Sequence, residues 1–118
     1  MTTTLYGIPN CDTIKKARAW LDAHGIAYAF HDWRKHGVDA ARITRWVDDL
    51  GWEALLNRAG TTFRKLPDAD TAELDGSRAL AIMIAHPAAI RRPVLERCGT
   101  LLVGFAPARY EAALLTGD

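Results

Sequence analysis

The chain has 118 residues, a formal net charge of +1, and 49% hydrophobic and 25% charged residues. This length predicts one domain with its own core, and the composition is ordinary for a soluble globular protein. The near-neutral charge argues against general binding of nucleic acids or anionic membranes, and no stretch approaches the ~18 uninterrupted apolar residues of a membrane helix.

The first part of the chain predicts a strand, a helix and a second strand. Residues 4–8 form an apolar run that ends in a Pro-Asn turn, which is typical of a buried strand. Residues 12–24 carry apolar side chains at helical spacing, and Gly25 follows as a stop. Aromatic residues alternate with other side chains over 26–30, which predicts a strand. Such a βαβ unit places its two strands parallel.

The middle of the chain predicts mainly helices. Residues 31–37 form a polar loop, and Asp39 is placed to cap a helix that runs to about residue 50. Further helices are expected at 52–58, within 68–74 and over 76–86, with an irregular connection at 61–66. The expected buried faces consist of Ala40, Ile43, Trp46, Val47 and Leu50 in one helix, and Leu80, Ile82, Met83 and Ile84 in another.

The last part predicts a β-hairpin followed by a helix. Residues 91–96 and 101–105 read as strands joined by a Gly-containing turn, and a helix is expected at 107–115. The resulting order, β-α-β, several helices and β-β-α, predicts an α/β fold. We expect a thioredoxin-like mixed four-stranded sheet, within a single domain spanning 1–118, and an all-helical insertion after strand two at about 39–90.

Cys11 lies where the first helix begins. The first turn of a helix offers free N–H groups and the positive end of the helix dipole, and both stabilise the reactive thiolate. Asp12 either opposes this effect through its charge or caps the helix. The alternative interpretation is a buried, inert cysteine that fills the joint between strand and helix.

Arg92 and Pro93 precede the third predicted strand, which a thioredoxin-like arrangement places beside Cys11. An arginine there lowers the pKa of the thiol and can hold an anion with two parallel hydrogen bonds. The Arg92–Pro93 bond is a candidate for the cis isomer, and the sequence leaves both isomers open.

Other polar groups point to less specific roles. His24, His31, His36 and His86 share no metal-ligand spacing, so no metal site is expected. The cations at 34–36 and 64–65 form either a solvated face or a basic patch for an acidic partner. Two cysteines do not make a disulfide framework, and residues 1–4 show no secretory pattern, so a cytoplasmic location is expected.

Residues 8–17 resemble the N-terminal signature of the arsenate reductase (ArsC) family, specifically its Spx/YffB-like branch. The resemblance continues, in register, through residues 31–37, 55–66, 86–94 and 102–105. It implies a thioredoxin-like domain with a helical insertion, a redox or nucleophilic cysteine at Cys11, and an arginine at Arg92 that precedes a cis-proline.

Two features depart from the family pattern. Arsenate reductases of this kind use three arginines around the cysteine, and Arg92 matches one of them. Asn57 aligns with the second, with Arg58 adjacent, and an uncharged residue near Gly104 occupies the third. Spx regulators carry a Cys-x-x-Cys switch, whereas Ile14 occupies the second cysteine position here. The pattern argues against efficient arsenate reduction and excludes that intramolecular disulfide.

The resemblance implies a thiol-disulfide oxidoreductase, specifically a glutathione-dependent thiol reductase. Cys11 is expected to be the nucleophile that forms a mixed disulfide, and Arg92 to bind the anion and stabilise the thiolate. The residues expected to shape the substrate site are Asn10, Thr13, Arg58 and Pro93.

Reduction of an oxidised Cys11 is expected to need an external thiol. The other cysteine, Cys98, is predicted in the hairpin turn, away from Cys11, so it is not expected to resolve a mixed disulfide there. Glutathione is therefore the expected co-substrate, with no bound cofactor. The alternatives are an Spx-like module that binds RNA polymerase or another protein, and an arsenate reductase. No nucleic-acid or membrane partner is expected.

Overall fold

The computed structural model describes residues 3–9, 11–97 and 99–115. They belong to two compact units. The sheet unit combines Met1–His36 with Arg92–Asp118, and the helical unit is the continuous segment Gly37–Arg91. The sheet unit therefore consists of residues from both ends of the chain.

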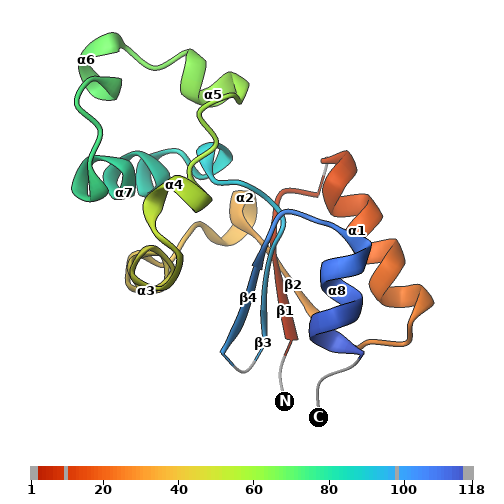
Figure 1. The fold of residues 1–118 in the computed structure, drawn as a ribbon. Coiled ribbons are helices and arrows are strands. Elements are labelled where there is room, and N and C mark those ends of the chain that lie inside the picture. Colours follow the sequence, from red (N-terminus) through yellow and green to blue (C-terminus); the bar gives the residue numbers. More distant parts are fainter. Residues whose placement is uncertain (1–2, 10, 98, 116–118) are drawn as a thin grey trace. The chain divides into compact units, whose positions relative to one another are not determined.

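The sheet unit contains a mixed four-stranded sheet of order β2-β1-β3-β4 (Figure 1). Its strands are β1 (Thr3–Gly7), β2 (Ala29–Asp32), β3 (Val94–Arg97) and β4 (Thr100–Val103). β1 pairs in parallel with β2 and antiparallel with β3, and β3 pairs antiparallel with β4. This arrangement confirms the predicted α/β, thioredoxin-like sheet.

Two helices, α1 (Asp12–Ala23) and α8 (Pro107–Leu114), cover one face of this sheet (Figure 1). The core between them and the sheet consists of Leu5, Ala17, Leu21, Leu95, Tyr110 and Leu114. Full burial of one leucine side chain contributes about 1.5–3 kcal/mol. The apolar face of α1 is therefore what fixes this helix, and with it Cys11, against the sheet.

β2 begins later in the chain than the alternating pattern predicted. Its ladder with β1 starts at Ala29 and continues through His31 and Asp32, which the sequence placed in a polar loop. Ile26 and Tyr28 still pack against the core, but from the segment before the strand. Residues after β2 form the short helix α2 (Trp33–His36) instead of a loop.

The helical unit consists of one-turn and longer helices. They are α3 (Ala40–Leu50), α4 (Trp52–Leu55), α5 (Thr61–Arg64), α6 (Asp68–Thr71) and α7 (Gly76–Ala85), followed by the 3₁₀ turn η1 (Pro87–Ala89). Asp39 caps α3 as predicted, since its carboxylate accepts the N–H of Ala41 at 3.0 Å. Asp75 caps α7 in the same way through the N–H of Arg78.

Some predictions for the helical unit were wrong. The irregular connection expected at 61–66 contains α5, a single turn whose N–H groups bond to the carbonyls of Gly60 and Thr61. Ile43, Trp46, Ile82 and Met83 are buried as expected, whereas Ala40 and Leu50 are exposed and Leu80 and Ile84 are half-buried. Helical spacing alone overestimated how wide the buried faces are.

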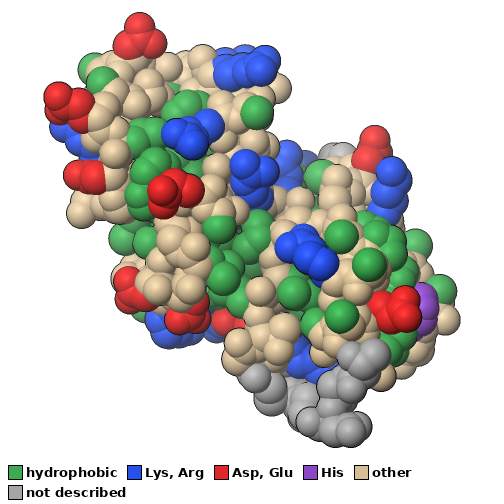
Figure 2. Space-filling model, in the orientation of Figure 1, with side chains coloured by type: hydrophobic (Ala, Val, Ile, Leu, Met, Phe, Trp, Pro, Cys, Tyr) green, Lys and Arg blue, Asp and Glu red, His purple; other side chains and the backbone are tan. Residues whose placement is uncertain are grey.

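Within the described residues, no helix has the length and apolar character needed to cross a bilayer. On the face of the sheet unit that Figure 2 presents, charged side chains are scattered among hydrophobic and neutral ones. That mixture agrees with a formal net charge of only +1.

Candidate active site

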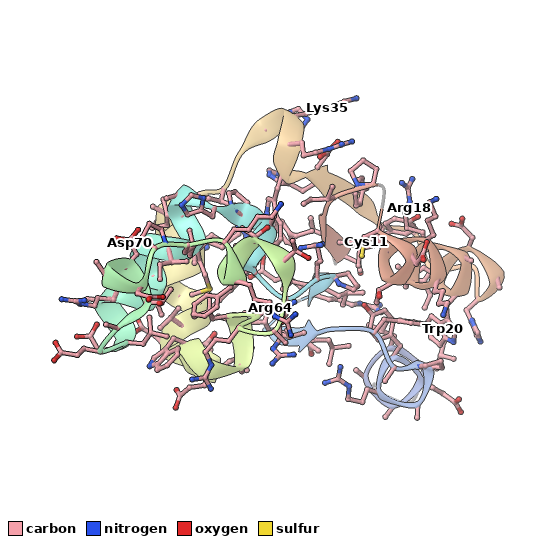
Figure 3. All side chains as sticks on the ribbon, turned by 90° about the horizontal axis from the view of Figure 1, so that it is seen from above. Cys11, Arg18, Trp20, Lys35, Arg64 and Asp70 are labelled. Atoms are coloured by element: carbon pink, nitrogen blue, oxygen red, sulfur yellow. The ribbon has the colours of Figure 1, made fainter. Side chains whose placement is uncertain are left out.

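Cys11 is the N-cap residue of α1 and has an extended backbone, with φ −93° and ψ 130°. A tight turn precedes it, in which the Cys11 N–H donates to the carbonyl of Ile8 at 3.4 Å. The Cys11 carbonyl in turn accepts the N–H of Lys15 at 3.1 Å, which starts the helix. Figure 3 shows the thiol at this end of α1. The cysteine is only partly buried and is not in a disulfide.

The pKa of Cys11 results from opposing effects. Partial burial raises the pKa of the thiol, because the charged form loses water. The N–H groups of Ile14 and Thr13 and the guanidinium of Arg92, which donates a hydrogen bond, all lower it. Their sum outweighs burial, so the pKa of Cys11 lies below its usual value. The site therefore favours the thiolate, which is the nucleophilic form.

Arg92 reaches Cys11 from the start of β3. Because β3 pairs with β1, with Val94 opposite Tyr6, the residues just before β3 lie beside the residues just after β1. The Arg92–Pro93 peptide bond is cis. The carbonyl of Pro93 accepts the N–H of Gly104 at 2.8 Å, which ties this segment to the residue after β4.

Gly7 allows the first turn of α1 to pack closely against the end of β1. A Cβ atom at Gly7 would collide with the side chain of Ile14, and it would lie 3.7 Å from the Cβ of Arg92. Ile14 is fully buried, so it has little room to move aside. The absent side chain of Gly7 thus makes space at the joint that carries both Cys11 and Arg92.

The residues predicted for the site fall into three groups. Cys11, Thr13, Arg92 and Pro93 all belong to the sheet unit, and Thr13 contributes through its backbone N–H. Arg58 belongs to the helical unit, where its guanidinium carbon lies 5.6 Å from the ring centre of Trp52. Asn10 and Cys98 lie outside the described residues.

One contributor to the site, Gly7, was missed at the sequence level. The backbone N–H of Ile14 is one of the first-turn donors expected from the sequence, although the side chain of that residue indicated only a core position. The role of Gly7 is steric, and a glycine at the end of an apolar strand was the available signal for it.

No candidate metal centre is found among the residues that the structure describes. No three His, Cys, Asp or Glu residues there are grouped closely enough to hold an ion.

Several known proteins are similar to this chain in sequence or in structure. The ArsC family profile matches residues 6–113. A solved structure of a protein named YFFB is 55% identical and covers 96% of this chain and 99% of its own, with a TM-score of 0.94. An uncharacterized protein of Haemophilus influenzae is 40% identical over 93% of this chain and 96% of its own length. The global transcriptional regulator Spx of Streptococcus mutans is 27% identical over 86% of this chain and 75% of its own.

Proposed function

The chain belongs to the ArsC family, and from that premise we propose that it is a thiol-disulfide oxidoreductase with glutathione as its co-substrate. The observation that supports this is the environment of Cys11, whose pKa is lowered by the helix N–H groups and by Arg92. A thiolate that is partly exposed at a helix N-terminus is suited to attack a disulfide.

In the first step, the Cys11 thiolate attacks the glutathionyl sulfur of a mixed disulfide between glutathione and a substrate thiol. The sulfur–sulfur bond of the substrate breaks as the Cys11–glutathione disulfide forms. The substrate sulfur leaves as a thiolate and takes a proton from water. The substrate is thereby reduced, and Cys11 is oxidised.

In the second step, the thiolate of a second glutathione attacks the glutathionyl sulfur of the Cys11 adduct. Glutathione disulfide leaves, and the Cys11 thiolate is regenerated with its stabilising contacts to Arg92 and the helix N–H groups. Each turnover thus consumes one free glutathione, which leaves as glutathione disulfide together with the glutathionyl group of the substrate. Arg92 also offers a guanidinium to an anionic substrate beside the reacting sulfur.

An external thiol fits this site because the Cys-x-x-Cys position holds Ile14, which is 0% exposed. A local thiol at that position is what other thiol-disulfide proteins use to resolve a mixed disulfide. Without it, Cys11 needs a second molecule to release its adduct. Glutathione carries a net negative charge, which matches the cation at Arg92.

The test is the reaction of Cys11 with glutathione disulfide, followed by intact mass across a pH series in a Cys98→Ser background. We expect one glutathione adduct, absent in Cys11→Ser, and a rate midpoint below the ~8.5 of a free cysteine. Added glutathione should remove the adduct and release glutathione disulfide. An unreactive Cys11, or an adduct that glutathione does not resolve, would rule out the proposal.

A second candidate function is an Spx-like protein-binding regulator, with RNA polymerase as the partner to test. Its support is the likeness to the global transcriptional regulator Spx over 86% of this chain. The buried Ile14 lacks the thiol of a Cys-x-x-Cys switch, so binding would not depend on that disulfide. A specific pull-down of RNA polymerase that Cys11→Ser leaves unchanged, from a protein that shows no glutathione-dependent turnover, would favour this function.

A further inference from the structure

A cavity of about 390 Å³ lies beside the turn that carries Cys11. It is lined by Pro9, Arg18, Phe30, Asp32, Arg34, Lys35 and His36. Pro9 belongs to the turn closed by the hydrogen bond from the Cys11 N–H to Ile8. This volume is within the ~300–1,000 Å³ range of small-molecule sites. All its lining residues belong to the sheet unit, so the cavity is part of one compact body.

The charge of the cavity wall is predominantly positive. Arg18, Arg34 and Lys35 face a single carboxylate, that of Asp32. Asp32 is 6% exposed, and its Oδ1 accepts the backbone N–H of Arg34 at 2.8 Å, so part of its accepting capacity is already used. A bound carboxylate would therefore meet more cationic donors than competing anions.

Arg18 is held in place before any ligand arrives. Its Nε donates to the hydroxyl of Tyr28 at 3.0 Å, and its guanidinium carbon lies 4.6 Å from the ring centre of Phe30. These two contacts fix the guanidinium plane, which reduces the entropy lost when it binds an anion. A fixed arginine in a cavity wall is better suited to recognition than a mobile surface cation.

The space continues past Arg18 toward the segment that precedes β2, an edge strand of the sheet. A second cavity of about 400 Å³ shares Arg18 and Phe30 with the first and adds Asp22, Ile26, Ala27 and Tyr28. Figure 3 shows Arg18 beside the turn of Cys11, with Lys35 on α2. The two cavities therefore follow the sheet edge away from the thiol.

The dimensions fit a peptide-sized thiol. Arg18 is seven residues beyond Cys11 on the same helix, which corresponds to ~10 Å at about 1.5 Å per residue. An extended tripeptide spans a similar ~10 Å from end to end, at about 3.3–3.6 Å per residue, so a central cysteine lies ~5 Å from either end. The long side chain of Arg18 tilts toward the N-terminus of its helix and spans the remaining distance. A peptide whose sulfur reacts at Cys11 can therefore place a terminal carboxylate toward Arg18, which shares its cavity with Arg34 and Lys35.

We propose that the cavity lined by Pro9, Arg18, Arg34 and Lys35 is a subsite for the carboxylate-bearing arm of the peptide disulfide that reacts at Cys11. This inference rests on the proposed function and deepens it, since it assigns the substrate class as anionic peptide disulfides and thiols. Arg92 acts at the reacting sulfur. Arg18, Arg34 and Lys35 instead favour substrates that carry a carboxylate beside that sulfur.

The test uses S-methylglutathione, which keeps both carboxylates but cannot form a disulfide, and calorimetry at low ionic strength. We expect the double variant Arg34→Gln/Lys35→Gln to weaken binding about tenfold. The matched control is Lys15→Gln/Lys16→Gln, because it removes the same charge from exposed positions of α1 that do not line the cavity. The control should bind within about twofold of the parent. The diethyl ester of the probe should bind weakly and equally to all three proteins.

Two results would overturn the subsite. One is equal binding of the acid and the ester by the parent protein, and the other is equal weakening, or none, in both double variants. The outcome is separable from that of the proposed function, because Cys11→Ser should bind S-methylglutathione like the parent. Binding without any reactivity of Cys11 would reject the oxidoreductase proposal and leave the anion subsite in place.

Discussion

Cys11 is controlled by groups that come from two distant parts of the sequence. Thr13 and Ile14 supply backbone N–H groups from α1, while Arg92 comes from the start of β3. Burial acts in the opposite direction and raises the pKa of the thiol. Of these contributions to the pKa of Cys11, that of Arg92 comes from a side chain, so a substitution can remove it and measure its share.

Replacing Arg92 should make Cys11 less acidic. Arg92→Ala removes both the hydrogen bond and the positive charge beside the thiol, so the pKa of Cys11 should rise. Arg92→Lys keeps the charge but loses the planar donor geometry, and its effect should be intermediate. The matched control is Arg91→Ala, which removes an exposed arginine next to it in the chain. Thiolate absorbance against pH measures the change, and an equal shift in both alanine variants would contradict the assignment.

The lowered pKa of Cys11 also predicts a pH-dependent contribution to stability. Between the pKa of the folded chain and the ~8.5 of the unfolded chain, only the unfolded chain binds the proton. The stabilising contribution therefore grows as pH rises through this window and is complete above ~8.5. It is lost as pH falls through the pKa of the folded chain.

The direction of this pH dependence is tested by denaturant unfolding of the parent and of Cys11→Ser. Both proteins carry Cys98→Ser and are kept under reducing conditions. The difference in the free energy of unfolding should increase from about pH 5 to about pH 9, in favour of the parent. A difference that is flat or decreases with pH would show that the thiolate is not stabilised in the folded chain.

At the scale of elements, the joint between β1 and α1 depends on Gly7. Gly7→Ala should reduce the free energy of unfolding by about 1–3 kcal/mol, because its methyl group meets the buried side chain of Ile14. Gly76→Ala is the control, since a Cβ there would meet only Trp52, at 3.9 Å. That change should stay within about 0.5 kcal/mol of the parent. Similar losses in both variants, measured by urea unfolding, would contradict the steric explanation.

The sequence predicted the order of elements because periodicity and turn residues are local signals. The parallel and antiparallel pairing of the sheet followed from that order, and Asp39 was a correct cap. The start of β2 was not predictable in the same way. Ile26 and Tyr28 alternate like a strand because they contact the core, yet the ladder with β1 begins at Ala29. An alternating pattern of side chains indicates which residues are buried. The residue at which a strand begins depends on its hydrogen bonds to the partner strand.

The candidate site was predicted through Cys11 and Arg92, whose residue types carry chemistry. The structure places Arg92 at Cys11, together with the N–H groups of Thr13 and Ile14 from the first turn of α1. The cavity lined by Arg18, Arg34 and Lys35 was foreseen only as a basic run at 34–36. Arg18 belongs to a different element, and only folding brings α1 and α2 to the same wall.

At the scale of the whole molecule, the sheet unit is completed by its last helix. Leu114 of α8 is 8% exposed and belongs to the core, while the neighbouring Leu115 is 46% exposed. Leu114→Ala should cost about 2–5 kcal/mol of unfolding free energy, and Leu115→Ala at most about 0.5 kcal/mol. Segment-resolved hydrogen exchange of Leu114→Ala should show lost protection in β1, β3 and α1. Equal destabilisation by the two variants would contradict this assignment of the core.

The two-part origin of the sheet unit has a consequence for the chain as the ribosome makes it. Cys11 emerges early, whereas Arg92 follows some 80 residues later, which is roughly 4–16 s at about 5–20 residues per second. During that interval β1 has no β3 beside it, and the thiol lacks the guanidinium that lowers its pKa. A nascent chain therefore carries a Cys11 thiol without the contribution of Arg92, and full stabilisation of the thiolate requires the finished sheet. Completion of synthesis and activation of the thiol are thus coupled by the order of the strands.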